Sequence, residues 1–181
     1  MDKTRREILT WNDVDKLIDH LLPQFGRNSP EFDSMMMISR GGIIPGGLLA
    51  EAMNITYILL AAVDFPAELE RPLNYCSASN LYAWPRFLQF PENGLLEGRS
   101  ILVVDDVWGS GRTITSVKNR VLGAGGLPFT CVLHFNPHRN LFGSACPDYY
   151  AAITDAYIVY PWEVERGTDR VFLNNIPESL L

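Results

Sequence analysis

The chain has 181 residues, of which 47% are hydrophobic and 20% charged, as expected for a soluble globular domain with a sizeable core. Its formal net charge of −6 argues against a broad surface for binding a phosphate backbone, so we expect no nucleic-acid partner. No apolar run reaches the roughly 18 residues of a membrane helix, and MDKTRREILT lacks an apolar signal core. We therefore expect a cytoplasmic protein without a membrane partner.

Three cysteines are present, at Cys76, Cys131 and Cys146. They lie far apart in the sequence, their number is odd, and none belongs to a CxxC pair. Free thiols in a reducing compartment explain this pattern most simply. A thiol nucleophile is the alternative, but no local motif supports it.

The first predicted element is a helix that begins after Thr10. Thr10 and Asp13 have the spacing of a capping box, and Pro23 is predicted to end the helix. Apolar residues recur between them at helical spacing and form one face: Val14, Leu17, Ile18, Leu21 and Leu22.

A strand, a helix and a second strand are predicted next. The strand is the apolar run SMMMIS at 34–39, the helix covers 43–55, and the second strand starts at Thr56. Residues 66–95 are rich in Pro, Asn, Ser and aromatic residues without a clear period. They predict a long loop or an irregular hairpin, which is either a lid over a site or a surface excursion.

The second half repeats the alternation of strand and helix. The predicted elements are an apolar strand at 101–104, a helix over 113–126, a strand at 129–135 and short strands within 149–155 and 156–162. Continuous apolar runs are typical of parallel strands that are covered on both faces. The fold class predicted is α/β, with a mainly parallel central sheet flanked by helices.

The stretch ILVVDDVWGSGRT, residues 101–113, carries the strongest chemical signal. Asp105 and Asp106 stand at the carboxyl end of a predicted parallel strand, where ligands bind in such sheets. Glycines in the following loop allow backbone N–H groups to turn inward, and the helix that begins next adds positive potential. Ser110 and Thr113 add hydroxyl groups. Together these features predict a cradle for a phosphate monoester.

Two carboxylates beside a phosphate need a positive or hydroxylated partner. Ribose hydroxyls, a bound Mg²⁺ or a developing positive charge on a sugar would each serve. The chain has no GxxxxGK[ST] motif and no GxGxxG that opens the first helix, so neither an ATPase P-loop nor a dinucleotide-binding site is predicted. A plain helix cap is the alternative.

These segments resemble a known family. ILVVDDVWGSGRT is similar to the phosphoribosyl-diphosphate motif of type I phosphoribosyltransferases. ISRGGIIPGGLLAEAMNI is similar to the first catalytic loop and helix of bacterial xanthine-guanine and hypoxanthine phosphoribosyltransferases, and AYIVYPWE resembles their base-stacking segment. The resemblance runs from about residue 34 to residue 163. It implies one domain over 1–181 of the type I fold, with a small hood built from the chain ends.

The resemblance also implies roles for matching positions. Asp105, Asp106 and Arg40 would be the catalytic residues. Mg²⁺ would be the cofactor, held by Asp105, Asp106 and Glu163. Pyrophosphate would be bound at Ser39, Arg40, Gly41 and Gly42, with a cis Arg40–Gly41 peptide. The 5′-phosphate would be bound by Gly109, Ser110, Gly111, Arg112 and Thr113, and the base by Asn136, Tyr157 and Ile158.

The implied reaction transfers ribose 5-phosphate from phosphoribosyl diphosphate to a purine-like nucleobase, with pyrophosphate and a nucleotide as products, in nucleotide salvage. The segment 66–95 would close over the reacting centre, and a homo-oligomer is expected from the resemblance. Nucleobase, phosphoribosyl diphosphate and the two products are thus the expected partners.

Two positions depart from the 6-oxopurine pattern. Gly109 stands where those enzymes carry an aspartate near the purine N7, so no general base is apparent there. Asn136 stands where they carry a lysine, although His134, His138 and Arg139 are close by in the sequence. A pyrimidine or modified base as acceptor, or a non-catalytic nucleotide-binding regulator on the same fold, are therefore the alternatives.

Overall fold

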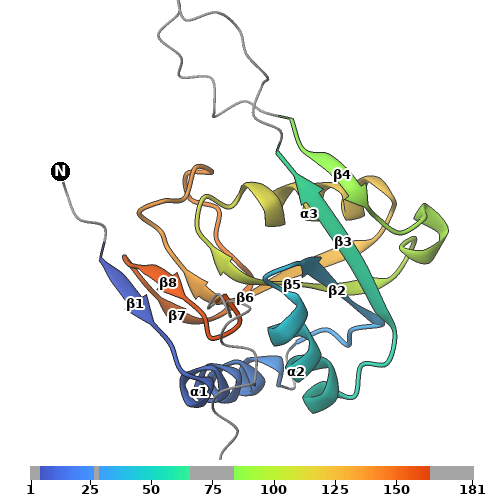
Figure 1. The fold of residues 1–181 in the computed structure, drawn as a ribbon. Coiled ribbons are helices and arrows are strands. Elements are labelled where there is room, and N and C mark those ends of the chain that lie inside the picture. The colour runs from blue at the N-terminus through green and yellow to red at the C-terminus, as the bar shows by residue number, and fades with distance from the viewer. Residues whose placement is uncertain (1–4, 27–28, 66–83, 164–181) are drawn as a thin grey trace, which may run out of the picture.

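The computed structural model describes residues 5–26, 29–65 and 84–163 (Figure 1). Its helices and strands, in chain order, are β1 (Arg6–Ile8), α1 (Trp11–Leu21), η1 (Leu22–Phe25), β2 (Ser34–Ser39), α2 (Ile43–Met53), β3 (Ile58–Asp64), β4 (Arg86–Gln89), η3 (Asn93–Leu95), β5 (Ser100–Trp108), α3 (Arg112–Gly123), β6 (Leu127–Phe135), β7 (Tyr149–Ile153) and β8 (Tyr157–Val159). None of the helices in this part of the chain has the length and apolar character needed to cross a bilayer.

Six strands form the central sheet, in the order β4-β3-β2-β5-β6-β7. All neighbouring pairs are parallel except β3 and β4. The prediction of a mainly parallel α/β sheet is therefore confirmed. A second, two-stranded sheet pairs β1 with β8 in parallel. The sequence analysis did not predict β1, because its three residues are all exposed and show no apolar pattern.

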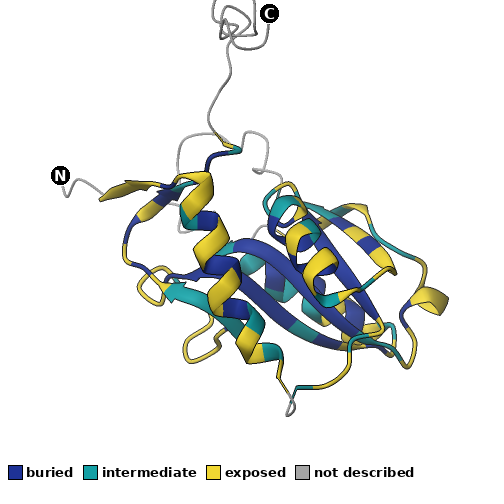
Figure 2. Ribbon diagram, turned by 90° about the horizontal axis from the view of Figure 1, so that it is seen from below, coloured by how far each residue is buried: buried dark blue, intermediate teal, exposed yellow. Residues whose placement is uncertain are grey.

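Two hydrophobic clusters cover the two faces of the sheet. Met35 and Met37 of β2 pack into one cluster with apolar residues of α1 and α2. Met36 and Ile38 of the same strand pack into the other cluster, against α3. Successive strand residues point to opposite faces, so a strand that is covered on both faces must be apolar throughout. Figure 2 shows the buried central strands between helices whose outer surfaces are exposed.

The capping box at the first helix is confirmed. The backbone N–H of Asp13 donates to the Thr10 hydroxyl at 3.3 Å, and the backbone N–H of Thr10 donates to the Asp13 carboxylate at 2.9 Å. α1 ends at Leu21, and Pro23 lies in the short 3₁₀ turn that follows. A proline fits there because its ring opposes continuation of the α-helix while its φ suits a tighter turn.

Most predicted bounds lie within a few residues of those in the structure, and two segments differ in a way that affects the site. β5 does not stop at Val104 but runs on to Trp108, because its pairs with β6 continue past the acidic residues. Residues 66–83 lie outside the described residues. The rest of the segment 66–95 contains η3 and β4, and β4 pairs with β3 in the antiparallel direction. The single domain over 1–181 with a hood from the chain ends stays a prediction.

Candidate active site

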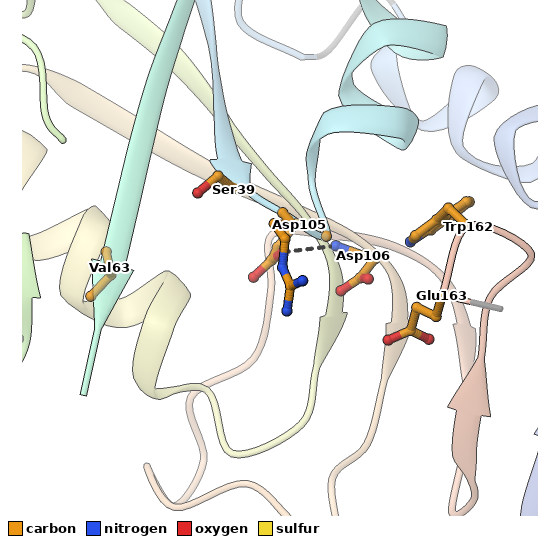
Figure 3. A pocket seen from close by; sticks show the side chains of 8 residues that line it. Ser39, Val63, Asp105, Asp106, Trp162 and Glu163 are labelled. Carbon is orange, nitrogen blue, oxygen red and sulfur yellow. Dashed lines mark hydrogen bonds between the residues drawn. The ribbon is translucent and has the colours of Figure 1, made fainter. Parts of the chain in front are cut away.

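Asp105 and Asp106 lie in the last part of β5, where the carboxyl ends of the parallel strands meet. Each residue is only 9% exposed. The backbone N–H of Asp106 donates to the Asp105 carboxylate at 3.0 Å, which fixes one acid relative to the other (Figure 3). Two buried carboxyl groups that are adjacent in sequence therefore stand together at the ligand-binding edge of the sheet.

A cavity of about 750 Å³ opens at this edge. The residues around it come from four separated parts of the chain, and Figure 3 shows their side chains. The lining residues are Ser39, Arg40, Gly41, Val63, Asp105, Asp106, Trp162 and Glu163. The loop after β2, the end of β5 and the segment after β8, which the sequence analysis placed in one site, thus face one cavity.

The peptide bond between Ser39 and Arg40 is cis. The prediction of a cis bond at Arg40–Gly41 is therefore wrong by one residue. β2 remains paired with β3 through Ser39, and the backbone N–H of Gly42 already donates to the carbonyl of Ile38 at 2.8 Å. The chain must reverse directly after the last paired residue, which places the unusual peptide at Ser39–Arg40.

Two glycines are required by close packing after β2. A Cβ atom on Gly41 would lie 2.5 Å from the carboxyl group of Asp106, and one on Gly42 would overlap the carbonyl oxygen of Val104. The first distance is far below a van der Waals contact between these atoms. The Ser39–Gly42 loop can approach the acidic pair this closely only without side chains at these two positions.

Burial raises the pKa values of both acids. For Asp105 the desolvation is reinforced by the neighbouring charge of Asp106. The pKa of Asp106 rises to about 6, mainly through desolvation and then through the charge of Glu163. The Trp162 indole N–H faces Asp106 and offsets part of that rise, although its geometry falls short of a hydrogen bond (Figure 3). A cation or hydroxyl donors would favour the charged form of the pair.

The acidic pair fits Mg²⁺ in one specific way. Among the described residues, no group of three or more His, Cys, Asp or Glu side chains is arranged to hold a metal ion. Mg²⁺ usually binds proteins through one or two carboxylates and keeps waters and substrate phosphates as its other ligands. Asp105 and Asp106 could supply two such carboxylates, and the metal roles of Asp105, Asp106 and Glu163 all stay predictions.

The glycine loop after β5 is tightly held. Gly111 has φ +78°, a backbone angle that favours glycine. A Cβ atom at this position would also overlap the Trp108 indole, so close packing favours glycine as well. The Trp108 indole N–H donates to Asn140 at 3.1 Å, and the backbone N–H of Leu141 donates to the carbonyl of Ser110 at 3.1 Å.

The helix α3 begins at Arg112, directly after this loop. The Ser110 hydroxyl accepts from the Arg112 backbone N–H at 3.4 Å, and the Arg112 guanidinium lies 4.3 Å from the ring centroid of Phe65. The first turn of a helix offers unpaired N–H groups and positive potential. The predicted phosphate-binding residues therefore lie in this loop and at the start of α3, and their binding of a 5′-phosphate stays a prediction: Gly109, Ser110, Gly111, Arg112 and Thr113.

A second cavity of about 110 Å³ adjoins the first. The two cavities share Asp106 and Glu163 in their linings. The remaining residues around the smaller one are Val107, Gly109, Asn136, Arg139, Ala156, Tyr157, Ile158 and Tyr160. The three residues predicted to bind a base are thus brought together beside the acidic pair.

These three residues differ in their surroundings. Asn136 is 1% exposed, and its carbonyl oxygen accepts from the backbone N–H groups of His138 and Arg139 at 3.1 and 3.3 Å. Its side chain therefore holds the turn after β6. Tyr157 is 44% exposed, and its ring has the Arg6 guanidinium at 5.8 Å, whereas Ile158 is buried.

Six lining residues were not predicted as site residues, namely Val63, Val107, Arg139, Ala156, Tyr160 and Trp162. Val63 lies on β3, which the apolar run from Thr56 marks only as a strand. Arg139 follows the turn after β6 and lines the smaller cavity. Tyr160 and Trp162 come from the segment AYIVYPWE, whose aromatic residues are a weak signal because most buried aromatics serve packing.

Comparison with solved structures shows extensive similarity of fold. A purine phosphoribosyltransferase from Pyrococcus horikoshii Ot3 superposes with a TM-score of 0.69 at 26% identity, covering 87% of this chain and 93% of that chain. The Helicobacter pylori xanthine-guanine-hypoxanthine phosphoribosyltransferase superposes with a TM-score of 0.70 at 13% identity, covering 88% and 95%.

A hypothetical protein from Neisseria gonorrhoeae with bound ppGpp also superposes. Its TM-score is 0.70 at 22% identity, and the match covers 90% of this chain and 92% of that chain. No protein-family model matches the sequence, and no curated protein matches it either. The similarity therefore lies in the three-dimensional fold far more than in the sequence.

Proposed function

Because the chain has the fold of the type I phosphoribosyltransferases, we propose that it transfers ribose 5-phosphate from phosphoribosyl diphosphate to a purine-like base. Pyrophosphate is released in this reaction. The observation that carries the proposal is the pair of adjoining cavities with Asp106 and Glu163 in their common wall. One cavity offers a cation and two acids for a sugar diphosphate, and the other has the size and mixed lining for part of a flat ring.

The larger cavity binds the sugar diphosphate in this proposal. The Ser39 hydroxyl, the Arg40 guanidinium and the backbone of Gly41 and Gly42 hold the pyrophosphate. Asp105 and Asp106 accept hydrogen bonds from the ribose hydroxyls and stabilise positive charge that develops on the sugar. Bound Mg²⁺, held by the acidic pair, would neutralise charge on the leaving pyrophosphate. The close approach of Gly41 to Asp106 brings the two halves of this site together.

The loop after β5 binds the 5′-phosphate in this scheme. Gly111, with its positive φ, turns the backbone toward the start of α3, and the hydroxyls of Ser110 and Thr113 add donors. The contacts of Trp108 and of Ser110 with residues 140–141 hold this loop before any ligand arrives. A loop that is already held loses less conformational entropy when it binds phosphate.

The base occupies the smaller cavity in the proposal. Tyr157 would stack on the ring, and Ile158 would contact its apolar edge. The side-chain oxygen of Asn136 already accepts hydrogen bonds from two backbone N–H groups. Asn136 would therefore contact the base as a donor, through its amide N–H₂ group. Gly109 provides no proton acceptor, so the incoming nitrogen would have to lose its proton to water or to another residue.

Further parts of the proposal rest on the family resemblance. Closure of the segment 66–95 over the reacting centre, a homo-oligomeric state, a place in nucleotide salvage and a cytoplasmic location all belong to it. Residues 66–83 lie outside the described residues, so the closing segment stays a prediction.

A nucleotide-binding regulator is the second candidate. It is favoured by the similarity to the Neisseria gonorrhoeae protein with bound ppGpp and by the missing acid at Gly109. A protein of this kind would keep the acidic pair and the phosphate loop and would bind a nucleotide without turnover. A pyrimidine or modified base as acceptor is the remaining alternative.

One experiment separates these candidates. Pyrophosphate release from phosphoribosyl diphosphate with Mg²⁺ is measured in the presence of guanine, xanthine, hypoxanthine, adenine, uracil or orotate. Release that depends on one or two purines supports the proposal, and release with uracil or orotate moves the acceptor to pyrimidines. Binding of ppGpp or a nucleoside monophosphate without release for any base would favour the regulator.

A further inference from the structure

Tyr160 is buried directly after β8, with 1% of its surface exposed. Its hydroxyl donates to the backbone carbonyl of Asp106 at 2.9 Å, and it lies 2.8 Å from Nδ1 of His134. A phenol has a single proton, and here that proton goes to the carbonyl. The imidazole of His134 must therefore donate from Nδ1 to the Tyr160 oxygen, which completes a chain of two hydrogen bonds that ends on Asp106.

The backbone at Asp106 has fewer strand partners than the rest of β5. Pairs with β2 end at Val104, opposite Met37, although β2 itself runs on to Ser39. Pairs with β6 run to Asp105 and resume at Val107. Asp106 is therefore paired with neither neighbouring strand, and its backbone carbonyl is held by the Tyr160 hydroxyl instead.

Tyr160 also holds the segment that follows it. Its ring stacks on Trp162 with the ring centroids 4.6 Å apart and the planes 6° from parallel. Its backbone N–H donates to the Glu163 carboxylate at 2.9 Å, and its carbonyl accepts from the Glu163 backbone N–H at 3.0 Å. One residue thus contacts both Asp106 and Glu163, the two acids shared by the two cavities.

The chemistry of Tyr160 suits a permanent donor. Burial, followed by the charges of Asp106, Asp105 and Glu163, raises its pKa well above the usual value for a phenol. Burial also lowers the pKa of His134, so the imidazole is neutral at physiological pH. Both hydrogen bonds therefore keep the same donors and acceptors across the range in which an enzyme would operate.

We propose that Tyr160 is a positioning residue that fixes Asp106 relative to Glu163 and so sets the wall between the sugar cavity and the base cavity. This inference rests on the proposed function, in which the two cavities hold the two reactants. A ligand that occupies both cavities requires a fixed distance between Asp106 and Glu163, whereas a ligand confined to the larger cavity does not. Loss of the Tyr160 hydroxyl should therefore weaken a spanning ligand selectively.

The test compares Tyr160→Phe with Tyr149→Phe. Each change removes one phenolic hydroxyl with a hydrogen bond, but the Tyr149 hydroxyl donates to Ser29 at 3.3 Å, away from both cavities. Phenylalanine keeps the stack on Trp162. Binding of GMP, which would span both cavities, and of pyrophosphate, which would occupy only the larger one, is measured by calorimetry with Mg²⁺.

Tyr160→Phe is expected to weaken GMP binding about tenfold, which corresponds to about 1.4 kcal/mol, and pyrophosphate binding less than twofold. Tyr149→Phe is expected to leave both affinities unchanged. Equal losses for GMP and pyrophosphate, or no loss for GMP, would overturn the inference.

A second variant separates positioning from folding. Tyr160→Phe leaves the buried His134 N–H without its acceptor, so the melting temperature should fall. Adding His134→Leu removes that orphan donor and should restore part of the melting temperature while GMP binding stays weak. Recovery of GMP affinity together with the melting temperature would show that Tyr160 serves stability alone.

The same data distinguish this inference from the proposed function. If the wild-type protein binds GMP but releases no pyrophosphate with any base, the proposed transferase activity is wrong and the selective effect of Tyr160→Phe on GMP still stands. If the wild-type protein binds neither GMP nor pyrophosphate, both are overturned. With an active enzyme, Tyr160→Phe should lower kcat about tenfold and change the KM for phosphoribosyl diphosphate less than twofold.

Discussion

Asp105 and Asp106 concentrate the chemistry of the site at two adjacent residues. Their side chains are buried and their pKa values are raised. A positively charged or hydrogen-bond-donating ligand would stabilise their charged forms, so the site favours ligands of this kind. These two acids face a cavity with Arg40 on its wall, and neither forms a salt bridge within the described part of the chain.

The acidic pair provides the most direct prediction at this scale. If the proposed function holds, the double variant Asp105→Asn/Asp106→Asn should lower kcat/KM for phosphoribosyl diphosphate at least about 100-fold, because the groups proposed to stabilise the sugar in the transition state lose their charge. Steady-state pyrophosphate release measures this effect. Asp155→Asn, which changes an exposed acid that lines neither cavity, is the control. Unchanged affinity and turnover in the double variant would show that the site is elsewhere.

Gly109 leads to a second residue-scale prediction. A Cβ atom at Gly109 meets no atom within 4 Å, so an aspartate can be accommodated there beside the smaller cavity. If Gly109 limits use of 6-oxopurines, Gly109→Asp should raise kcat/KM for guanine or hypoxanthine at least about tenfold, since a positioned base commonly contributes more than this. Gly109→Asn is the matched control without a basic carboxylate. Equal effects of the two changes would mean that the proton leaves by another route.

At the scale of elements, the site depends on how closely the Ser39–Gly42 loop and α2 approach β5. Gly42 is the N-cap of α2, and the atoms that a Cβ atom at this position would meet are backbone atoms of Val104 and Ile38. Backbone atoms cannot move aside as a flexible side chain can. The separation between the Ser39–Gly42 loop and the acidic pair is therefore set by the packing of one element against another.

A glycine pair on this element tests that reasoning. Gly42→Ala should lower the free energy of unfolding by about 2 kcal/mol or more, because the added methyl group overlaps backbone atoms. Gly47→Ala, in the same helix but with open space around it, should raise it by about 0.5–1 kcal/mol through helix propensity. Urea denaturation measures both. A stable Gly42→Ala protein would mean that the loop and β5 are not packed as described.

Elements were the best predicted level of the structure. The apolar runs at 34–39 and 129–135 match β2 and the greater part of β6, and the capping residues at Thr10 and Asp13 mark the start of α1. The predicted strand at 101–104 stopped too early, because the carboxylates of Asp105 and Asp106 suggested a loop. Pairing with β6 carries the strand past them, a tertiary effect that overrides the local preference of aspartate.

At the scale of the whole molecule, the acidic site lowers stability. The pKa of Asp106 is higher in the folded protein than in an unfolded chain, so the folded state binds more protons between about pH 4 and pH 6. Stability must therefore fall as pH rises through this window. Below it, Asp106 is protonated in both states and the difference disappears. Functional sites commonly carry such a cost to stability.

This cost can be measured without any activity. Asp106→Asn should raise the free energy of unfolding by about 2 kcal/mol at pH 7.5 without divalent ions, and by much less at pH 4. Thermal denaturation across pH 4 to 8 gives the comparison, with Asp155→Asn as an exposed control. Added Mg²⁺ should raise the melting temperature of the wild-type protein at pH 7.5 and not that of Asp106→Asn. A pH-independent difference would contradict the raised pKa.

The sequence by itself determined the alternating α/β architecture and the position of the acidic pair and its glycine loop at the end of a strand. The spacing of apolar residues, the capping residues and the turn glycines that indicate these features are all local in the sequence. It also allowed the base-side candidates to be named from a resemblance. Only the tertiary structure decided which peptide is cis, that β1 pairs with β8, and that Tyr160 joins Asp106 to Glu163. Tyr160 lies 54 residues from Asp106, so its role depends on packing across the fold that no local sequence pattern encodes.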